Sequence, residues 1–514
     1  MNLRSSMRLF VAATLVVAFA AAGVASAQEK VVRIAMSGPI TTFDPANHRS
    51  RINENVIRNV FDSLVTVTPA GDTVLEMAES VEQIDDTTWE FRIRDGIRFH
   101  NGDPLTAADV AFSFNRVVVE GAMDGQTSPR KALMGSLERV EEVDPSTVRF
   151  HLAAPESELR VLTSAVFMQV MPKDYFERVG IEEFVRNPVG AGPFRVVEAD
   201  FQERIVLERF DDYWGGAPDL AGEPGPARLD RVVFLVVPDA SARVAALRAG
   251  DIDIIQDVLA DQIPVIESDT NVVLKQQQGT NPVFLAFTVT QPPFDDPRVR
   301  RAIAHAIDYD LLVDALFGGR ADALYGLPYT WNSEVKHDGL EPLDYDPIAA
   351  MAMLRAAGSS NLAFTIDTIS TWRLVAEAVA QMLQDVGVDA QVRIWDQAAL
   401  TPAVQAGERQ AMVFTWGNAS GNPAWPQFPN ASGTGYTHWD DAEFRELMQR
   451  APGIVDRGER EAVFRRAYEI HHEQLPLITL LVPRAVEATS ARVSGFEVHP
   501  GGRVNMHRVD IQPR

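Results

Sequence analysis

Residues 364–416 read FTIDTISTWRLVAEAVAQMLQDVGVDAQVRIWDQAALTPAVQAGERQAMVFTW. The stretch alternates apolar runs of strand length with helical patterns, and it predicts strands at 364–369, 390–395 and 411–416 and helices at 374–386 and 400–406. Regular alternation of strand and helix is typical of an open sheet with parallel strands. The sequence therefore predicts an α/β fold for this part of the chain.

Two segments extend the α/β pattern toward the N-terminus. An apolar strand is predicted at 232–237, a helix at 239–249 and a strand at 252–255, in the order that forms a βαβ unit with a right-handed crossover. A further strand is predicted at 31–36. The apolar residues Val56, Val60 and Leu64 follow it at helical spacing, and they predict one amphipathic helix over 52–64.

The region between these segments has a different pattern. Residues 89–94 alternate apolar and charged side chains, which predicts a strand with one buried face, and the Asp95-Gly96 turn leads into a second alternating run at 97–100. Thr106 and Asp109 resemble a helix-capping box, and apolar residues at helical spacing continue to Val118. A hairpin followed by a helix predicts an α+β unit.

The composition is that of a soluble globular protein with an acidic surface. The chain has 514 residues, of which 46% are hydrophobic and 23% charged, and its formal net charge is −24. This length predicts about three domains, and the negative charge opposes binding to nucleic acid or to anionic membranes. The chain contains no cysteine, which excludes disulfides, thiolate catalysis, cysteine-based zinc sites and iron–sulfur clusters.

The first 27 residues are expected to form a secretory signal peptide. Arg4 and Arg8 accompany an apolar run over 9–22, and Ala25-Ser26-Ala27 is a small-residue cleavage site. The run is too short to span the roughly 30 Å hydrocarbon core of a membrane. No cysteine follows the cleavage site to carry a lipid. We therefore expect a soluble chain that begins at residue 28 and is free in the periplasm.

Motifs for catalysis and for cofactor binding are incomplete. Residues 417–421 read GNASG, which places the serine one position too late for the nucleophile elbow G-x-S-x-G. Arg195 stands where a dinucleotide fingerprint needs its third glycine. Pro476 occupies the second ligand position of a zinc-type string that begins at His472. No enzymatic activity, cofactor or metal ion is predicted.

Several motifs together resemble one known family. They are TFDP at 42–45, FDSLV at 61–65, RDGIRFHNGDPLTAADV at 94–110, DDYWGG at 211–216 and FDDPRVRRA at 294–302. In this order they resemble the extracytoplasmic solute-binding proteins of the dipeptide, oligopeptide and nickel ABC importers, known as bacterial solute-binding protein family 5. Residues 89–110 are the most distinctive signature. Because residues 95–109 within it form predicted turns and a helix cap, we assign them a structural role.

The resemblance implies a periplasmic-binding-protein-like fold of two hinged α/β lobes plus an inserted α+β domain. Carried onto this chain, lobe I would comprise 28–57, 188–278 and 480–514, the inserted domain 58–187, and lobe II 279–479. Such a protein captures a solute by lobe closure, without a chemical step, and delivers it to an ABC permease complex in the inner membrane. The expected partners are a small peptide or peptide-like solute and the permease, and the protein is expected to be a monomer.

The ligand site is expected beyond the carboxyl ends of the strands, where open α/β sheets bind ligands. Four of the eight tryptophans fall within 372–425, near these ends. Tryptophan offers a large amphipathic ring with few rotamers to immobilise, although each ring could instead pack in the core. The resemblance places Arg373 where peptide-binding members can hold an arginine for the ligand carboxylate; as an alternative, it is a solvated charge at a helix start. The candidate ligand-binding residues are Phe43, Trp372, Arg373, Trp395, Trp416, Asn418, Asn422 and Trp425.

Asn422 bears on the kind of solute. In peptide-binding members of the family, the resemblance places an Asp at this position, where it pairs with the α-ammonium group of the ligand. An amide cannot neutralise a buried cation. Either another acid, such as Asp396 or Asp44, replaces it, or the solute is an oligosaccharide, an opine-like compound or a metal chelate. A secreted hydrolase is the alternative from another class, and delivery of the ligand to a chemoreceptor is a further one.

Overall fold

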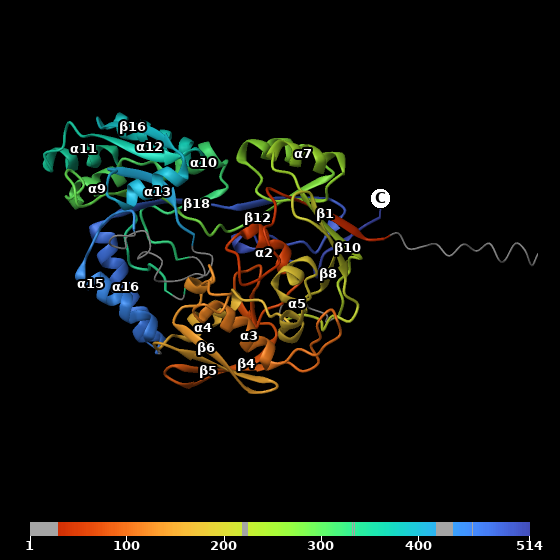
Figure 1. The fold of residues 1–514 in the computed structure, drawn as a ribbon. Coiled ribbons are helices and arrows are strands. Elements are labelled where there is room, and N and C mark those ends of the chain that lie inside the picture. The colour runs from red at the N-terminus through yellow and green to blue at the C-terminus, as the bar shows by residue number, and fades with distance from the viewer. Residues whose placement is uncertain are drawn as a thin grey trace, which may run out of the picture.

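Three large β-sheets organise the chain in the computed structural model, which describes residues 29–217, 225–330, 333, 335–417, 435–454 and 456–513. The part with the seven-stranded sheet is called lobe I, the part with the six-stranded sheet lobe II, and the part with the four-stranded sheet the insert (Figure 1). The predicted α/β fold, with two lobes and an inserted α+β part, is confirmed. None of the described helices is long and apolar enough to cross a membrane.

Lobe I is built around the first strand. β1 (Val31–Met36) pairs in parallel with β10 on one side and with β11 on the other. α7 (Ala240–Ala249) connects β10 to β11, as the βαβ pattern predicted; Asp239 caps its start and Gly250 ends it in the left-handed conformation. The sheet order is β12-β19-β11-β1-β10-β9-β8, with β8 (Phe194–Asp200), β9 (Arg204–Arg209), β10 (Arg231–Val236), β11 (Ile254–Ile255), β12 (Val272–Gln277) and β19 (Ala485–Ser490). After β11 come the 3-10 turn η2 (Ala260–Gln262) and α8 (Ile263–Glu267).

Lobe II contains the strands and helices predicted from residues 364–416. β15 (Ala363–Ile369) pairs in parallel with β16 (Asp389–Trp395) and β17 (Ala411–Thr415). α12 (Arg373–Asp385) and α13 (Gln397–Gln405) connect them, and α12 buries Val375, Val379 and Leu383 along one face. The sheet order is β14-β18-β13-β17-β15-β16, with β13 (Val283–Phe287), β14 (Ala321–Ala323) and β18 (Leu477–Pro483). The other α-helices among the described residues of lobe II are α9 (Pro297–His305), α10 (Tyr309–Phe317), α11 (Pro347–Ala356), α15 (Ala442–Arg450) and α16 (Arg457–Gln474).

The insert interrupts lobe I and lies at the lower end of the molecule in Figure 1. Its antiparallel sheet has the order β4-β5-β7-β6, with β4 (Ala78–Asp85), β5 (Thr88–Ile93), β6 (Leu137–Asp144) and β7 (Thr147–Leu152). The smaller elements are β2 (Val65–Val67), β3 (Thr73–Leu75), α3 (Ala107–Val118), α4 (Glu158–Val166) and α5 (Lys173–Arg186). The carboxylate of Asp109 accepts the backbone N–H of Thr106 at 2.8 Å, which confirms the predicted cap of α3.

The hairpin predicted over 89–100 is wrong in its second half. β5 pairs with β4 and β7, whereas residues 97–100 form no strand of this sheet. The backbone N–H of Phe99 instead donates to Asp103, and that of His100 donates to Gly190. The alternating pattern therefore belongs to a loop that fixes the insert to the segment entering β8.

The helix predicted over 52–64 is too long. α2 (Arg51–Ile57) ends early because the carbonyl groups of Asn59 and Val60 accept the N–H groups of Phe194 and Gly192, at 3.0 and 2.9 Å. A longer helix would need these carbonyls for its own ladder. Val60 and Leu64 are fully buried all the same. The spacing of the apolar residues thus predicted correctly that Val60 and Leu64 are buried. Where the helix ends was decided by the long-range hydrogen bonds to residues 192 and 194.

Two segments join the lobes. One leads from β12 to β13, and the other leads from β18 to β19 through Arg484. β18 pairs with β14 as far as Pro483, so the boundary expected at 480 would divide a strand of lobe II. A boundary at Arg484 leaves β18 in lobe II and β19 in lobe I intact. The two segments touch at Gly279, where a Cβ atom would lie 1.8 Å from the carbonyl oxygen of Pro483.

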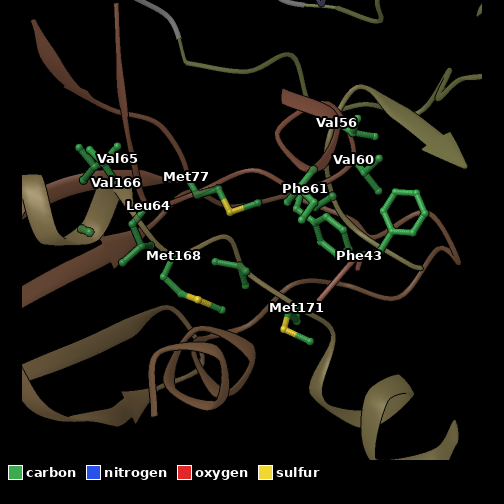
Figure 2. Packing of buried hydrophobic residues seen from close by; sticks show 14 of the residues in the cluster. Phe43, Val56, Val60, Phe61, Leu64, Val65, Met77, Val166, Met168 and Met171 are labelled. Atoms are coloured by element: carbon green, nitrogen blue, oxygen red, sulfur yellow. The ribbon is translucent and has the colours of Figure 1, made fainter. Parts of the chain in front are cut away.

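Lobe I and the insert share one hydrophobic core. In Figure 2, Phe43 and Val56 of lobe I lie beside Phe61 of the insert, in one cluster with Leu64 and Met171, and all five side chains are at most 1% exposed. Lobe II packs around a separate core. Because well-packed interiors resist shear, we expect lobe I and the insert to move together.

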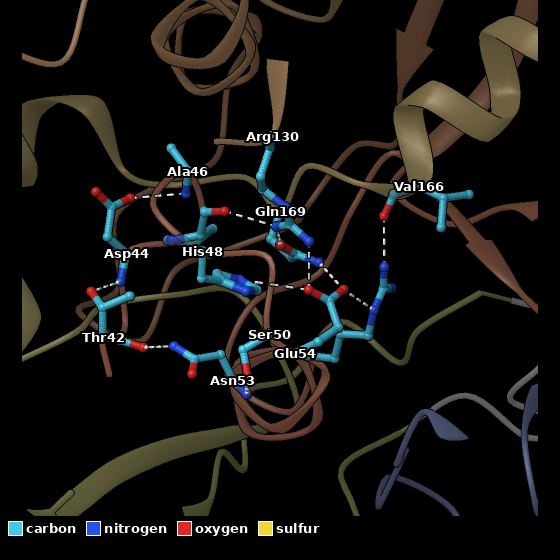
Figure 3. Close-up of polar contacts among 12 residues, drawn as sticks. Thr42, Asp44, Ala46, His48, Ser50, Asn53, Glu54, Arg130, Val166 and Gln169 are labelled. Atoms are coloured by element: carbon cyan, nitrogen blue, oxygen red, sulfur yellow. Dashed lines mark hydrogen bonds and ion pairs between the residues drawn. The ribbon is translucent and has the colours of Figure 1, made fainter. Parts of the chain in front are cut away.

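A buried ionic cluster also fastens α2 to the insert (Figure 3). The carboxylate of Glu54 accepts hydrogen bonds from Arg130 Nη2 at 2.6 Å and from Gln169 Nε2 at 2.9 Å, and it forms an ion pair with Arg58. Burial opposes the charged form of Glu54, but the two arginines outweigh that effect and hold its pKa well below the ordinary value. Burial also lowers the pKa of the nearby His48 to about 4, which keeps its ring neutral at pH 7.

Candidate functional site

The two lobes face one another across two pockets. The first, which we call the polar pocket, has a volume of about 230 Å³; its lining includes Arg51, Asp257 and Glu487 of lobe I and Trp372 of lobe II. The second, the apolar pocket, has a volume of about 640 Å³ and lies between residues 259–267 of lobe I and residues 314–320 and 371–375 of lobe II. Trp372 lines both pockets. Residues that follow β15 in lobe II and β11 in lobe I therefore border these pockets, at the carboxyl ends of two strands, whereas the described residues directly after β16 and β17 do not.

The polar pocket contains paired charges and a buried acid. Arg51 Nη2 lies 2.5 Å from Asp257 Oδ2. Asp257 lies two residues after the end of β11 and has a φ of +55°. Non-glycine residues adopt this left-handed conformation rarely, and it is often found at functional sites. Glu487 accepts a hydrogen bond from Gln256 Nε2 at 2.9 Å, and burial raises the pKa of Glu487 to about 8. The pocket thus offers charged and neutral hydrogen-bonding groups side by side.

Arg373, next to Trp372, is the first residue of α12 and is exposed. Its guanidinium lies 3.0 Å from the carboxylate of Glu377, one turn further along the helix. Arg373 is not among the residues that line the two pockets. In the present arrangement its charge is engaged within its own helix.

Trp395 ends β16 and is half-buried. Its Nε1–H donates to Asp367 Oδ1 at 2.7 Å, and Asp367 also accepts from Arg393 at 2.6 and 2.9 Å. The Arg409 guanidinium lies 4.9 Å from the centre of the ring. The polar edge of Trp395 is therefore held by a buried carboxylate, and the Arg393 guanidinium also lies over its ring, 5.1 Å from the centre.

Trp416 follows β17 and packs against Tyr436, with ring centres 5.5 Å apart. Tyr436 in turn contacts Phe414 and Phe284. Trp395 and Trp416 both border this aromatic cluster. The parallel strands β15, β16 and β17 thus bring Trp372, Trp395 and Trp416 to the same edge of one sheet. Of these three, only Trp372 lines the two pockets, and a ligand contact of Trp395 or Trp416 stays a prediction.

Phe43 and Asp44 lie away from the cleft. Phe43 has no exposed surface, and its ring meets Phe201 edge-on at 5.5 Å within the core of lobe I. Asp44 is 1% exposed and binds the Arg116 guanidinium through both oxygens, at 2.8 and 2.9 Å. Asp44 is therefore unsuited to replace an acid at the ligand site, because its charge is already compensated inside the protein. Asp396 is exposed next to Trp395.

Three candidate residues, Asn418, Asn422 and Trp425, lie outside the described residues. The sequence reasoning missed the lobe I side of the cleft. Asp257 follows a strand that was predicted, so the same strand-end rule would have found it. Within the described ranges, no group of three or more His, Asp or Glu side chains is arranged to hold a metal ion.

The comparisons with known proteins agree with this architecture. The model of the bacterial extracellular solute-binding proteins, family 5, matches residues 72–438. The dipeptide-binding protein of Escherichia coli (strain K12) is 27% identical, over 85% of this chain and 86% of that protein. The solved structure of HbpA2 from Haemophilus parasuis matches with a TM-score of 0.82 at 24% identity, over 94% of this chain and all of that one.

A second solved structure was determined with a ligand. It is the ABC transporter-associated periplasmic binding protein DppA from Helicobacter pylori in complex with the peptide STSA, which matches with a TM-score of 0.73 at 25% identity. The match covers 94% of this chain and 98% of that one. The family model matches well over half of the chain, and the likenesses extend over nearly all of it. This chain is a member of the bacterial extracellular solute-binding proteins, family 5.

Proposed function

We propose that this protein captures a small peptide or peptide-like solute between its lobes, without altering it, and delivers it to an ABC permease complex in the inner membrane. The observation that carries the proposal is the pair of pockets lined by both lobes and joined at Trp372. The peptide class is supported by the dipeptide-binding relative and by the neighbour solved with a bound peptide. A site shared by two lobes releases its solute only when they separate.

Lobe closure is part of this proposal. Lobe II has its own core and joins the rest of the chain through the segments at Gly279 and Arg484. A solute that contacts both lobes stabilises the closed arrangement by its greater affinity for it. Because the chain has no cysteine, spin labels can be attached through Val197→Cys in lobe I and Ile348→Cys in lobe II, both exposed. Solute should shift the distance between the labels, and an unchanged distance at saturation would contradict closure.

The solute itself is identified most directly by native mass spectrometry. Protein purified from its own periplasm should carry a peptide mass, and the mature protein should retain peptides from a mixture two to five residues long. Asn422 keeps a non-peptide solute as the second candidate, because it lacks the carboxylate that would neutralise an α-ammonium group. An oligosaccharide, opine-like or chelate mass, with no peptide retained, would replace the peptide proposal by that alternative.

We further propose that the protein is exported, that it is cleaved after Ala27 and that it acts as a periplasmic monomer without catalysis. The division proposed is 28–57, 188–278 and 484–514 for lobe I, 58–187 for the insert and 279–483 for lobe II. Mass determination of the periplasmic protein tests the cleavage, and light scattering tests the monomer. Turnover of a peptide or glycoside by the purified protein would contradict the absence of catalysis.

A further inference from the structure

The apolar pocket brings together apolar side chains from both lobes. Leu259 of lobe I and Leu374 of lobe II line it and are 52% and 55% exposed. Phe317 and Trp372, both half-buried, belong to the same lining. A single exposed leucine is ordinary at a protein surface, but apolar side chains gathered on facing walls of one pocket indicate a binding surface.

The charged groups around this pocket are mainly acidic. Arg320 Nη2 lies 2.5 Å from Glu267 Oε1 on the opposite lobe, so its positive charge is already paired. Asp261 and Asp314 also line the pocket and form no ion pair with any residue in the described ranges. The lining therefore carries two carboxylates in excess, which repel a carboxylate on a ligand.

From this lining we infer that the apolar pocket receives a large aliphatic or aromatic side chain of the captured solute and excludes anionic groups. The inference rests on the proposed function, because it assigns one part of the same cleft. A volume of about 640 Å³ lies within the range of small-molecule pockets. Since Trp372 lines both pockets, a peptide whose polar backbone lies in the polar pocket can extend the neighbouring side chain past this ring.

The test uses the mature full chain and synthetic tripeptides in which one position at a time carries Ala, Leu or Glu. Calorimetric titration should show that the best Leu peptide binds at least tenfold more tightly than its Ala counterpart, which corresponds to about 1.4 kcal/mol, and that the Glu counterpart binds most weakly. Leu374→Ser and Leu259→Ser, on opposite walls, should each reduce the advantage of Leu over Ala to less than threefold. The affinity for the Ala peptide should stay the same.

Leu311→Ser is the matched control. Leu311 is 52% exposed on α10 but does not line the pocket, so this variant should retain the preference. Equal affinity of the wild-type protein for Leu, Ala and Glu peptides would overturn the inference and leave the proposed function standing. Equal weakening of all peptides by Leu374→Ser would also overturn it, since that result assigns the leucine to contact between the closed lobes. Failure of the wild-type protein to bind any peptide would instead overturn the proposed function.

Discussion

Replacing Glu54 by glutamine should destabilise the junction between lobe I and the insert severely. Glu54 is the carboxylate that contacts both Arg130 and Arg58, whose side chains are only 4% and 10% exposed. Glu54→Gln preserves the shape of the side chain but leaves two buried cations without that counter-charge. Breaking a buried ion pair by removing one partner costs about 3–5 kcal/mol. We therefore expect the free energy of unfolding to fall by about that amount.

Urea titration followed by tryptophan fluorescence measures this loss, with Glu79→Gln as the control. Glu79 pairs with Arg92 at 3.1 Å, but both side chains are more than half exposed, and exposed pairs contribute at most about 1 kcal/mol. The buried pair should therefore cost several times more than the exposed one. If the two variants unfold at the same urea concentration with the same slope, the assignment of a stabilising role to the buried cluster is refuted.

The pH dependence of unfolding, compared between the wild-type protein and Glu54→Gln, provides an independent check. The folded-state pKa of Glu54 is depressed below its ordinary value of 4.5. A carboxyl group of this kind contributes its full stability above the unfolded-state pKa and loses it as the pH falls toward the folded-state pKa. The difference in unfolding free energy between wild type and Glu54→Gln should therefore be constant from pH 6 to 8 and should shrink below about pH 4.5.

Three further variants test other parts of the structure. Gly279→Ala should lower stability and impair closure, because its Cβ would meet the carbonyl oxygen of Pro483 at 1.8 Å, whereas the control Gly458→Ala meets nothing nearer than 3.5 Å and should be neutral in thermal melts. Burial raises the pKa of Glu487, so its ionisation destabilises the folded wild-type protein as the pH rises from 4.5 to about 8. Glu487→Gln should therefore be more stable than the wild type, by on the order of 3 kcal/mol at pH 7. A difference in stability that does not change with pH would contradict this. Trp416→Ala should weaken solute binding in calorimetry with little effect on the ligand-free melting temperature, and a large thermal loss would assign the ring to the core.

The predictable part of the fold is the part decided by local pattern. The α/β alternation over 364–416 was predicted correctly because each strand and helix buries a face whose period is visible in the sequence. The helix over 52–64 was predicted too long because Asn59 and Val60 bond to residues more than 130 positions away. The same limit applies to 97–100, which alternates like a strand but is anchored to Gly190.

The candidate site shows the same division. The strand-end rule placed Trp372, Trp395 and Trp416 at one edge of lobe II, since a strand and its following loop are neighbours in sequence. It did not distinguish Phe43, which also follows a strand but has no exposed surface. Exposure depends on what packs over a loop, and Phe201, which covers Phe43, is distant in sequence.

The sequence by itself determined the family, the α/β alternation and the order of the segments, because motifs and periodicity are local properties of the chain. Only the tertiary structure decided which distant residues line the same pocket and which charged groups pair. Leu259 and Leu374 line one pocket although more than a hundred residues separate them, and Glu54 of α2 pairs with Arg130 of the insert. Periodicity reports that a face is buried, whereas the partner on that face depends on how distant segments pack.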